Sequence, residues 1–497
     1  MRGMRLACVV GMIGQIICAP RVLGQGSEEP PLNPFLADSP WPMTHRNPYC
    51  QASSPLPGPL PSEVTRGLFK TRTLSEEAVA ITLNLTPRNN EGKFSIWGSA
   101  RTRLYKLDGN QGRWRTTGSV AKAGKSEQAI SGAYTLLDHE GRLYIPRGTS
   151  VVVYQEEQPG IPRSPIKLMN RFALSKSEVL SEDEVIVGMN LTYDGWLALV
   201  TNRSLVVVMN RHTGETTSLR LNPEEEVSNS LAVDENGGLY VVTHKKMYRV
   251  HWNGKKLSVS WDSLYPTSDK PMPGRLGLGS GTTPTLMGTG AQDKLVVIAD
   301  GEKKMNLVAF WRDEIPKDWT PIPGFSERVA GIVPIQFGIP ERERAITDQS
   351  LLVRGYGAVA VNNDYGDHPT DSWSNFWTIL WSNYKEYAPY GIEKFEWVPG
   401  ERKLKSVWAN STLSVPNGIP SMSAATGQIY YLGQHEEKWT IEGVDWNTGQ
   451  LSFRETLEHA IKYNSYYAGM EIGYDGDLLS GTVGGALRFG KPSDSPR

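Results

Sequence analysis

One unit recurs along most of this 497-residue chain: an alternating apolar run, a turn that contains Gly, and a second alternating run. In one copy, the run at 191–199 turns at Asp194-Gly195 and leads into 205–209. Asp-Gly and Asn-Gly tolerate the positive φ of a tight hairpin turn, and period-2 alternation buries one face of each strand. Each unit is therefore expected to be a β-hairpin. Further copies begin near residues 136, 231, 295, 351, 422 and 472.

The spacing of these hairpins predicts how they assemble. Successive copies lie about 40 to 60 residues apart, which is the period of one propeller blade. The sequence predicts an all-β fold, a β-propeller of four-stranded antiparallel blades around a central channel. Seven blades are the estimate, with eight as the alternative. A two-sheet sandwich would need far fewer hairpins than the chain contains.

The first 24 residues have the pattern of a secretory signal peptide. Arg2 and Arg5 give a positive start, the apolar stretch 6–17 is too short to span a membrane, and Gly24 ends a stretch suited to cleavage. The prediction is a signal peptide at 1–24, an extended arm rich in Pro, Ser and Glu at 25–63, and a single β-propeller domain at 64–497. The protein is expected to be secreted, with an N-terminal anchor helix as the alternative.

Charge and cysteine content limit the partners of this chain. It has 52 basic and 53 acidic residues, so it lacks the basic excess of a nucleic-acid binder. No later segment is apolar enough to cross a membrane, and the oligomeric state stays open. Cleavage would leave only Cys50, so a large core rather than disulfides must hold the fold. Four sequons would accept glycans in a eukaryotic host: Asn84, Asn190, Asn202 and Asn410.

Familiar catalytic and metal-binding motifs are absent from the sequence. It has no His-Glu-x-x-His, Cys-x-x-Cys, Walker loop or Gly-x-Ser-x-Gly, and its eight histidines are scattered. Acidic turns such as Asp138-His139-Glu140 could be read as calcium loops, but hairpin turns need the same residue types for backbone reasons. We therefore expect no metal and no cofactor.

Polar residues gather where the innermost strand of each blade should begin, close to the channel. Their amides and hydroxyls could line a wet channel and hold an oriented ligand. The alternative is that they tie neighbouring blades together through backbone hydrogen bonds. The predicted ligand-binding set is Asn190, Asn229, Thr283, Gln349, Asn362, Asn363 and Asn417.

Aromatic residues provide a second set of candidate ligand contacts. One insertion is too aromatic for a routine solvated loop, and it could wall an apolar pocket at one face of the propeller or pack blade against blade. Its candidate contacts are Trp373, Trp377, Trp381, Tyr387 and Tyr390. Tyr466, in a smaller tyrosine cluster of the last blade, has the same two interpretations.

Several segments resemble those of quinoprotein-like β-propellers. They are the Trp-Pro-Met stretch within 39–47, the Gly- and Thr-rich stretch 279–288, and the Thr-Gly turns at 426–427 and 445–449. Redox members of that group bind pyrroloquinoline quinone, with a vicinal Cys pair and a Ca²⁺ held by carboxylate and Asn side chains. This chain has no such Cys pair, so the resemblance implies the propeller fold without the quinone or calcium.

The chain is also similar, more loosely, to secreted fungal propellers of tropolonic sesquiterpenoid pathways. The similarity lies in length, signal peptide, absence of disulfides and the Trp-Pro-Met stretch. Those proteins are hetero-Diels–Alderases that join a tropolone quinone methide to a humulene-type alkene. The resemblance implies a cofactor-independent enzyme of secondary metabolism that binds an apolar small molecule.

Such a reaction begins with the loss of water from a hydroxymethyl tropolone or a similar phenol. The candidate acids for that step are His45, His368, Asp364 and Tyr365. The pocket would then stack the two reactants in one orientation. Two other functions stay open: a non-catalytic secreted propeller that binds a glycan or a protein, and a quinone-dependent dehydrogenase.

Overall fold

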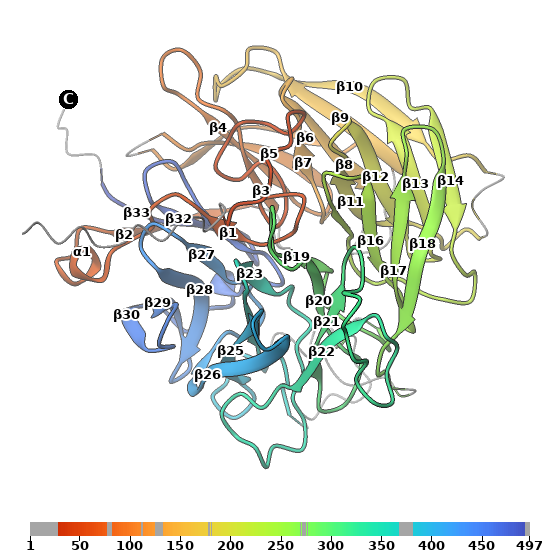
Figure 1. The fold of residues 1–497 in the computed structure, drawn as a ribbon. Coiled ribbons are helices and arrows are strands. Elements are labelled where there is room, and N and C mark those ends of the chain that lie inside the picture. The colour runs from red at the N-terminus through yellow and green to blue at the C-terminus, as the bar shows by residue number, and fades with distance from the viewer. Residues whose placement is uncertain are drawn as a thin grey trace, which may run out of the picture.

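The computed structural model describes residues 28–76, 82–110, 113–124, 133–176, 179, 181–268, 270, 275, 277–366 and 381–492. Within these ranges the strands form six four-stranded sheets and one nine-stranded sheet. The nine-stranded sheet contains two blades, which are joined where Ser414 pairs with Gln434, and one added strand. The described strands therefore make eight blades, which follow one another around a ring (Figure 1).

The first four blades each use four consecutive strands. Blade 1 contains β3 (Thr82–Leu85), β4 (Ser95–Ser99), β5 (Arg103–Asp108) and β6 (Arg115–Ala121). Blade 2 contains β7 (Leu136–Leu137), β8 (Arg142–Arg147), β9 (Ser150–Glu156) and β10 (Ile166–Ala173). Blade 3 contains β11 (Ile186–Leu191), β12 (Trp196–Thr201), β13 (Leu205–Asn210) and β14 (Thr216–Arg220). Blade 4 contains β15 (Ala232–Val233), β16 (Gly238–Val242), β17 (Lys246–Trp252) and β18 (Leu257–Leu264).

The remaining blades complete the ring. Blade 5 contains β19 (Thr285–Met287), β20 (Leu295–Ala299), β21 (Asn306–Trp311) and β22 (Val329–Pro334). Blade 6 contains β23 (Leu352–Arg354), β24 (Gly357–Val361), β25 (Tyr390–Val398) and β26 (Lys403–Ser414). Blade 7 contains β27 (Ser421–Ser423), β28 (Gln428–His435), β29 (Lys438–Asp445) and β30 (Leu451–Thr456). Blade 8 contains β31 (Met470–Ile472), β32 (Leu478–Thr482), β33 (Gly485–Gly490) and β2 (Lys70–Ser75).

The two ends of the described chain meet in blade 8. Its outermost strand, β2, comes from the N-terminal part of the chain and pairs antiparallel with β33 near the C-terminus. This pairing completes blade 8 with a strand from the other end of the described chain, and so closes the ring. The helical segments among the described residues are short: α1 (Pro61–Thr65) precedes β2, and the 3₁₀ turn η1 (Ile461–Tyr463) precedes blade 8.

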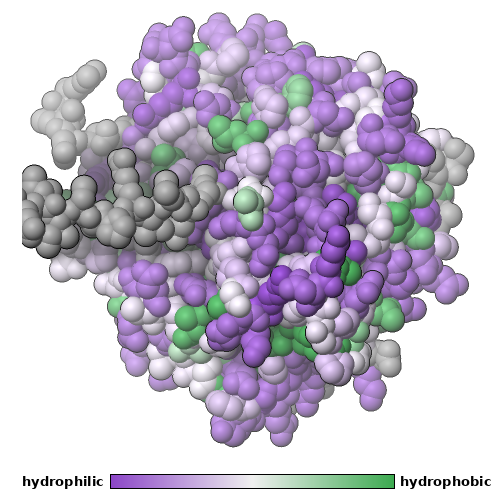
Figure 2. Space-filling model, viewed as in Figure 1, coloured by the Kyte–Doolittle hydropathy of each residue, from purple (hydrophilic) through white to green (hydrophobic). Residues whose placement is uncertain are grey.

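The core lies between neighbouring blades. One buried cluster, for example, joins Val206 and Val208 of blade 3 to Val241 and Val250 of blade 4. Period-2 alternation gives each blade two apolar faces, so every inner strand buries side chains against both neighbours. The face of the molecule in Figure 2 is mainly hydrophilic, with hydrophobic residues in small separate spots. No helix among the described residues is long and apolar enough to cross a membrane.

The predicted β-propeller is confirmed, but the estimate of seven blades is wrong by one. The unit without a sequence match is blade 1. Its first two strands, β3 and β4, are joined by residues 86–94, a nine-residue connection in place of a tight Asp-Gly or Asn-Gly turn. The pattern used to find hairpins therefore misses it.

The segment predicted as an arm is built into the ring. Backbone N–H groups of six innermost strands, one from each of six blades, donate to arm carbonyl oxygens at 2.8–3.1 Å. The pairs are Leu85 with Trp41, Leu137 with Pro42, Val233 with Pro48, Leu286 with Tyr49, Val353 with Gln51, and Met422 with Ala52. The next arm residues form β1 (Ser53–Ser54), the added strand, which runs parallel to β27. The division into domains stays a prediction, and residues 1–27 lie outside the described ranges.

The arm is held in a strained conformation. His45, Arg46, Cys50 and Ala52 all have φ between 53° and 71°, a region that residues other than Gly seldom adopt. Such strain persists only where the surroundings fix the backbone. Cys50 is buried as expected, with its Sγ 3.5 Å from the carbonyl oxygen of Leu231.

Asn190 is a brace between the arm and the ring. Its Nδ2 donates to the carbonyl oxygens of Pro48, at 3.0 Å, and Leu231, at 2.9 Å. Asn84 and Asn190 are both fully buried, so a glycan on either predicted sequon does not fit this fold. Asn202 and Asn410, the other two sequons, are half-buried.

We expect Asn190→Ala to destabilise the protein by about 1–3 kcal/mol, because two buried carbonyl oxygens each lose one hydrogen bond. Chemical denaturation measures the change. The control is Asn236→Ala, at an exposed turn position in blade 4, which should leave the unfolding free energy almost unchanged. Equal effects of the two substitutions would contradict a bracing role for Asn190.

Candidate functional site

The arm distinguishes the two ends of the ring axis. It binds the last residue of the innermost strand in blades 1, 2 and 4 and the middle residue in blades 5, 6 and 7, so most of it lies toward the end at which those strands finish. Thr44 and His45 reach across the axis to Thr135 and Ser350, which stand before innermost strands. We call the other end, where the innermost strands begin, the upstream end. Strand β24 runs antiparallel to β23, so the connection between β24 and β25 also lies at the upstream end. The polar segments before the innermost strands therefore share one face with the described part of the aromatic insertion, which begins at Trp381.

A hydrogen-bonded group crosses the axis itself. The Tyr134 hydroxyl of blade 2 lies 3.4 Å from the Thr283 hydroxyl of blade 5. His45 from the arm places Nε2 3.2 Å from the Ser350 hydroxyl of blade 6, and its ring centroid lies 5.8 Å from that of Tyr134. Three blades and the arm thus contribute polar groups to one place.

Burial keeps this axial group neutral. It lowers the pKa of His45 from its ordinary value to about 4, and it raises the pKa of Tyr134. At pH 7 both side chains are therefore uncharged hydrogen-bonding groups. His45 is poorly suited to the acid role predicted for it, because an imidazole with this pKa carries no extra proton at pH 7.

Gln349 is the least satisfied polar side chain at the upstream end. It is 1% exposed, and neither amide atom meets a hydrogen-bond partner among the residues that the structure describes. The backbone at this point is fixed, because the N–H groups of Asp348 and Gln349 donate to Asn363 Oδ1 at 2.9 and 3.2 Å. A buried amide left in this way is a candidate ligand contact.

Beside Gln349 lies a buried ion pair. Arg275 Nε is 3.5 Å from Asp348 Oδ1, and both side chains are almost fully buried. Gly281 makes room for this carboxylate, because a Cβ built on Gly281 would lie 1.8 Å from Asp348 Oδ1. The pairing neutralises the carboxylate, so this part of the site has no net charge.

The described end of the aromatic insertion, from Trp381, contacts the segments that precede the innermost strands of blades 7 and 8. The Trp381 ring lies 5.4 Å from that of Tyr384 and 5.6 Å from that of Tyr387. The next residue, Ser382, accepts a hydrogen bond from Asn417 Nδ2 at 3.0 Å, and Asn417 Oδ1 accepts from Ser465 at 3.2 Å. Trp373, Trp377 and His368 lie outside the described residues.

Most of the other predicted polar residues join segments of backbone. Asn362 Nδ2 donates to the Tyr390 carbonyl oxygen at 3.0 Å. Asn363 Nδ2, at 3.0 Å, and the Tyr365 hydroxyl, at 2.8 Å, both donate to the carbonyl oxygen of Pro416. These contacts fit the alternative interpretation, in which polar residues tie blade to blade.

Three further predicted residues also have structural partners. Asn229 Nδ2 donates to the Ser280 carbonyl oxygen at 3.3 Å, which links blade 4 to the segment before blade 5. Asp364 pairs with Arg344 at 3.1 Å, so this carboxylate is held as an ion-pair partner rather than as an acid. Asn190 contacts the arm, away from the upstream end.

Tyr466 and Tyr467 stand directly before the innermost strand of blade 8. Both have positive φ, 42° and 68°, and their half-buried rings lie 5.9 Å apart. Burial raises the pKa of both hydroxyls. Two consecutive strained tyrosines at the upstream end are a candidate ring-binding surface, since strain of this kind concentrates at functional sites.

Sequence reasoning did not select Tyr134, Arg275 or Asp348. Tyr134 stands three residues before Leu137, as Thr283 stands before Leu286 and Ser350 before Val353. Aligning the blades on their innermost strands would have found it. The Arg275–Asp348 pair joins residues more than 70 positions apart, and no local pattern indicates it.

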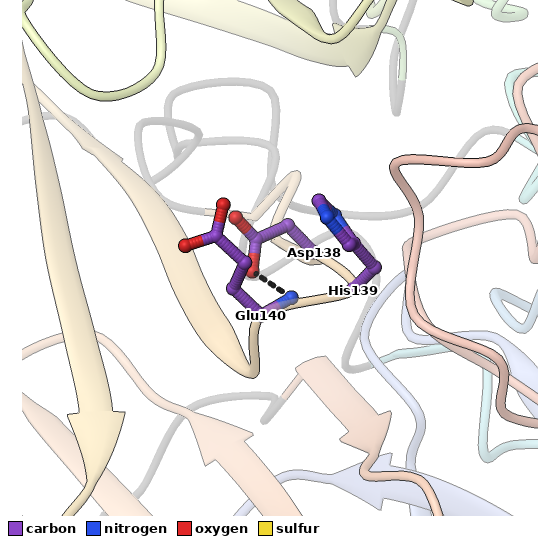
Figure 3. A group of neighbouring side chains, drawn as sticks. All are labelled: Asp138, His139 and Glu140. Atoms are coloured by element: carbon purple, nitrogen blue, oxygen red, sulfur yellow. Dashed lines mark hydrogen bonds between the residues drawn. The ribbon is translucent and has the colours of Figure 1, made fainter.

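One acidic group in the described part of the chain has the composition of a metal site. Asp138, His139 and Glu140 each offer a ligand atom within 4.8 Å of the others (Figure 3). The Asp138 carboxylate already accepts from the N–H groups of Glu140 and Arg142 and from the Tyr144 hydroxyl. The group therefore forms a hairpin turn in which the Asp138 carboxylate accepts hydrogen bonds from the turn itself, which fits the turn interpretation.

The residues at the axis also do not fit a quinone held above a calcium ion. Cys50 has no adjacent cysteine, and its thiol contacts the Leu231 carbonyl oxygen. The buried carboxylate at the upstream end, Asp348, faces the Arg275 guanidinium, whose positive charge would oppose a cation.

Two solved structures superpose on much of this chain. A europium-containing methanol dehydrogenase superposes with a TM-score of 0.53 at 11% identity, covering 91% of this chain and 97% of that one. The β-propeller domain of Myceliophteria thermophila Cps50 (Swd1) gives a TM-score of 0.42 at 12% identity, over 74% of this chain and 98% of that one. At these identities the likeness concerns the fold alone.

A sequence relative defines the family more closely. An uncharacterized protein of Archaeoglobus fulgidus is 39% identical over 471 residues, which cover 93% of this chain and 89% of that protein. The chain belongs to the same family as this archaeal protein. It matches no protein-family model.

The buried His45 makes stability depend on pH. Its folded pKa is about 4 and its ordinary value 6.5, so its contribution is fully present above pH 6.5 and is lost as the pH falls from 6.5 to 4. Relative to His45→Asn, the wild-type unfolding free energy should fall by on the order of 3 kcal/mol over this range. Denaturant titrations at several pH values measure this. His212→Asn, at an exposed position, is the control, and parallel curves for wild type and His45→Asn would contradict the assignment.

Proposed function

We propose that the protein binds an uncharged small molecule containing a ring at the upstream end of the propeller. The observation that carries the proposal is Gln349, a buried amide with both polar atoms unpartnered among the described residues. Half-buried Tyr466 and Tyr467 stand at the same end. The arm covers the opposite end of the axis, so a ligand would approach from the upstream face.

The polar groups suit a neutral ligand rather than an ion. Gln349 offers one acceptor and two donors without charge. The charges of Arg275 and Asp348 compensate each other at 3.5 Å, and the low pKa of His45 leaves it neutral at pH 7. A carbonyl or hydroxyl group on an otherwise apolar ring matches this combination, because each buried polar group needs one partner and the tyrosine faces supply apolar contact.

The reaction class that we propose is a cofactor-independent cycloaddition of the hetero-Diels–Alder type. It joins a tropolone quinone methide to a humulene-type alkene, as the resemblance to the fungal propellers implies. Orientation of two apolar reactants and hydrogen bonding to one carbonyl are its main needs, and neutral donors at a fixed position supply both. The preceding loss of water has less support, since Asp364 pairs with Arg344 and the Tyr365 hydroxyl donates to Pro416.

Binding is tested with tropolone itself, by intrinsic tryptophan and tyrosine fluorescence or by calorimetry. We expect wild-type protein to bind tropolone. Gln349→Ala should raise the dissociation constant about tenfold, because a buried hydrogen bond to the ligand is lost. The matched control is Gln450→Ala, at an exposed position after β29. No binding by wild type, or equal affinities for Gln349→Ala and wild type, would refute the site.

Catalysis is tested separately, by incubating the protein with a hydroxymethyl tropolone precursor and humulenol. Faster product formation or a single stereoisomer, lost in Gln349→Ala, is the expected result. Tropolone binding without any effect on rate or stereochemistry would instead favour the non-catalytic binding propeller.

Secretion is part of the same proposal and rests on the N-terminal pattern of residues 1–24. N-terminal sequencing of protein recovered from the culture medium should begin at Gln25. Protein retained in the cell with Met1 intact would overturn this part.

A further inference from the structure

A basic cleft lies on the opposite face from the proposed small-molecule site. It has a volume of about 980 Å³ and is lined by connections of three adjacent blades. Blade 1 contributes residues of the connection 86–94 and, at the facing ends of β5 and β6, Asp108, Asn110, Arg113 and Arg115; blade 2 contributes 161–163, and blade 8 contributes Asp475. The connection 86–94 follows β3, and Asp475 follows β31, and both strands are innermost in their blades. The cleft therefore lies at the end where the innermost strands finish, which is the face that carries the arm.

Positive charge is in excess in this cleft. Five cationic side chains line it, against three carboxylates, so two positive charges are uncompensated. The cations are Arg88, Lys93, Arg113, Arg115 and Arg163, and the carboxylates are Glu91, Asp108 and Asp475. A concave surface with one sign of charge concentrates the field and attracts counter-ions.

The pairing pattern shows where the excess charge lies. The Arg88 guanidinium forms an ion pair with the Asp475 carboxylate at 2.7 Å, and its central carbon lies 4.5 Å from the centroid of the Tyr474 ring. Lys93 is occupied by Glu91 at 2.5 Å.

Arg113 and Arg115 share one carboxylate. They lie 3.8 and 3.5 Å from the same Asp108 oxygen, and their side chains are 63% and 47% exposed. No ion pair joins Arg163 to a carboxylate among the described residues, and Arg163 is exposed. Arg113, Arg115 and Arg163 are therefore the groups with spare positive charge.

We propose that this cleft binds a dianionic phosphate or sulfate group. Guanidinium groups match the tetrahedral oxyanion with paired N–H donors, and a dianion compensates the two spare charges. Inorganic phosphate and inorganic sulfate share this chemistry, and a phosphate monoester keeps most of the second charge at pH 7, whereas a sulfate monoester carries one charge. The site is independent of the upstream site, so either proposal can fail without the other.

Calorimetric titration with inorganic phosphate and with inorganic sulfate, at constant ionic strength set by chloride, tests the proposal. We expect binding of at least one anion, weakened about threefold by Arg163→Gln and at least tenfold by Arg113→Gln combined with Arg163→Gln. Glu91→Gln should tighten binding about threefold, because it releases Lys93. The matched control is Arg402→Gln, whose side chain pairs with Asp318 outside the cleft and should leave affinity unchanged.

The same titration with glucose 6-phosphate and with glucose 6-sulfate distinguishes the two kinds of ester. A preference for glucose 6-phosphate assigns the cleft to a dianionic ester, as the two spare positive charges predict. Equal affinities, or a preference for the singly charged sulfate ester, would contradict the match of a dianion to the two spare charges. Heats no larger than those of chloride, or affinities unchanged in the double variant, would overturn the proposal.

Discussion

The hydrogen bonds between the arm carbonyls and the innermost strands are the constraint on which the rest of this structure depends. In a propeller, one edge of each innermost strand faces the axis, where its N–H groups have no strand partner. Here six such groups are satisfied by one continuous stretch of chain, from Trp41 to Ala52. Each of the six carbonyl groups in this stretch accepts a hydrogen bond from a different blade, so the stretch links six blades to one another. Its four left-handed residues are the conformational cost of following the curve.

The arm gives the two faces of the ring different chemistry. At the face that the arm covers, polar side chains such as Asn190 form hydrogen bonds to the arm. At the upstream face the same kinds of residue remain near a short axial group, and Gln349 is left unsatisfied. Among the described residues, Gln349 is the side-chain amide with both polar atoms unpartnered, so binding capacity at the upstream face is concentrated there.

The sequence predicts the propeller because each blade repeats a local signal, alternation around a Gly turn, that needs no tertiary context. It misses blade 1 where the connection 86–94 is longer than a hairpin turn. The place of the arm could not be predicted, because its partners are backbone N–H groups and carry no side-chain signature. For the site, residue type was a weaker guide: Asn362 and Asn363 look like Gln349 in sequence, but their amides are used up on the backbone of Tyr390 and Pro416.

The net charge of the whole chain does not predict the charge of a single cleft on its surface. A net charge of −1 argues against an extended basic face and hence against nucleic acid as a partner. It says nothing of a small concave region, where Arg113 and Arg115 share one carboxylate and Arg163 has none among the described residues. The arginines come from the outer connections of blades 1 and 2, which are neighbours around the ring. Local excess of one sign inside a neutral chain is therefore a product of the fold, and only the arrangement of the blades makes it visible.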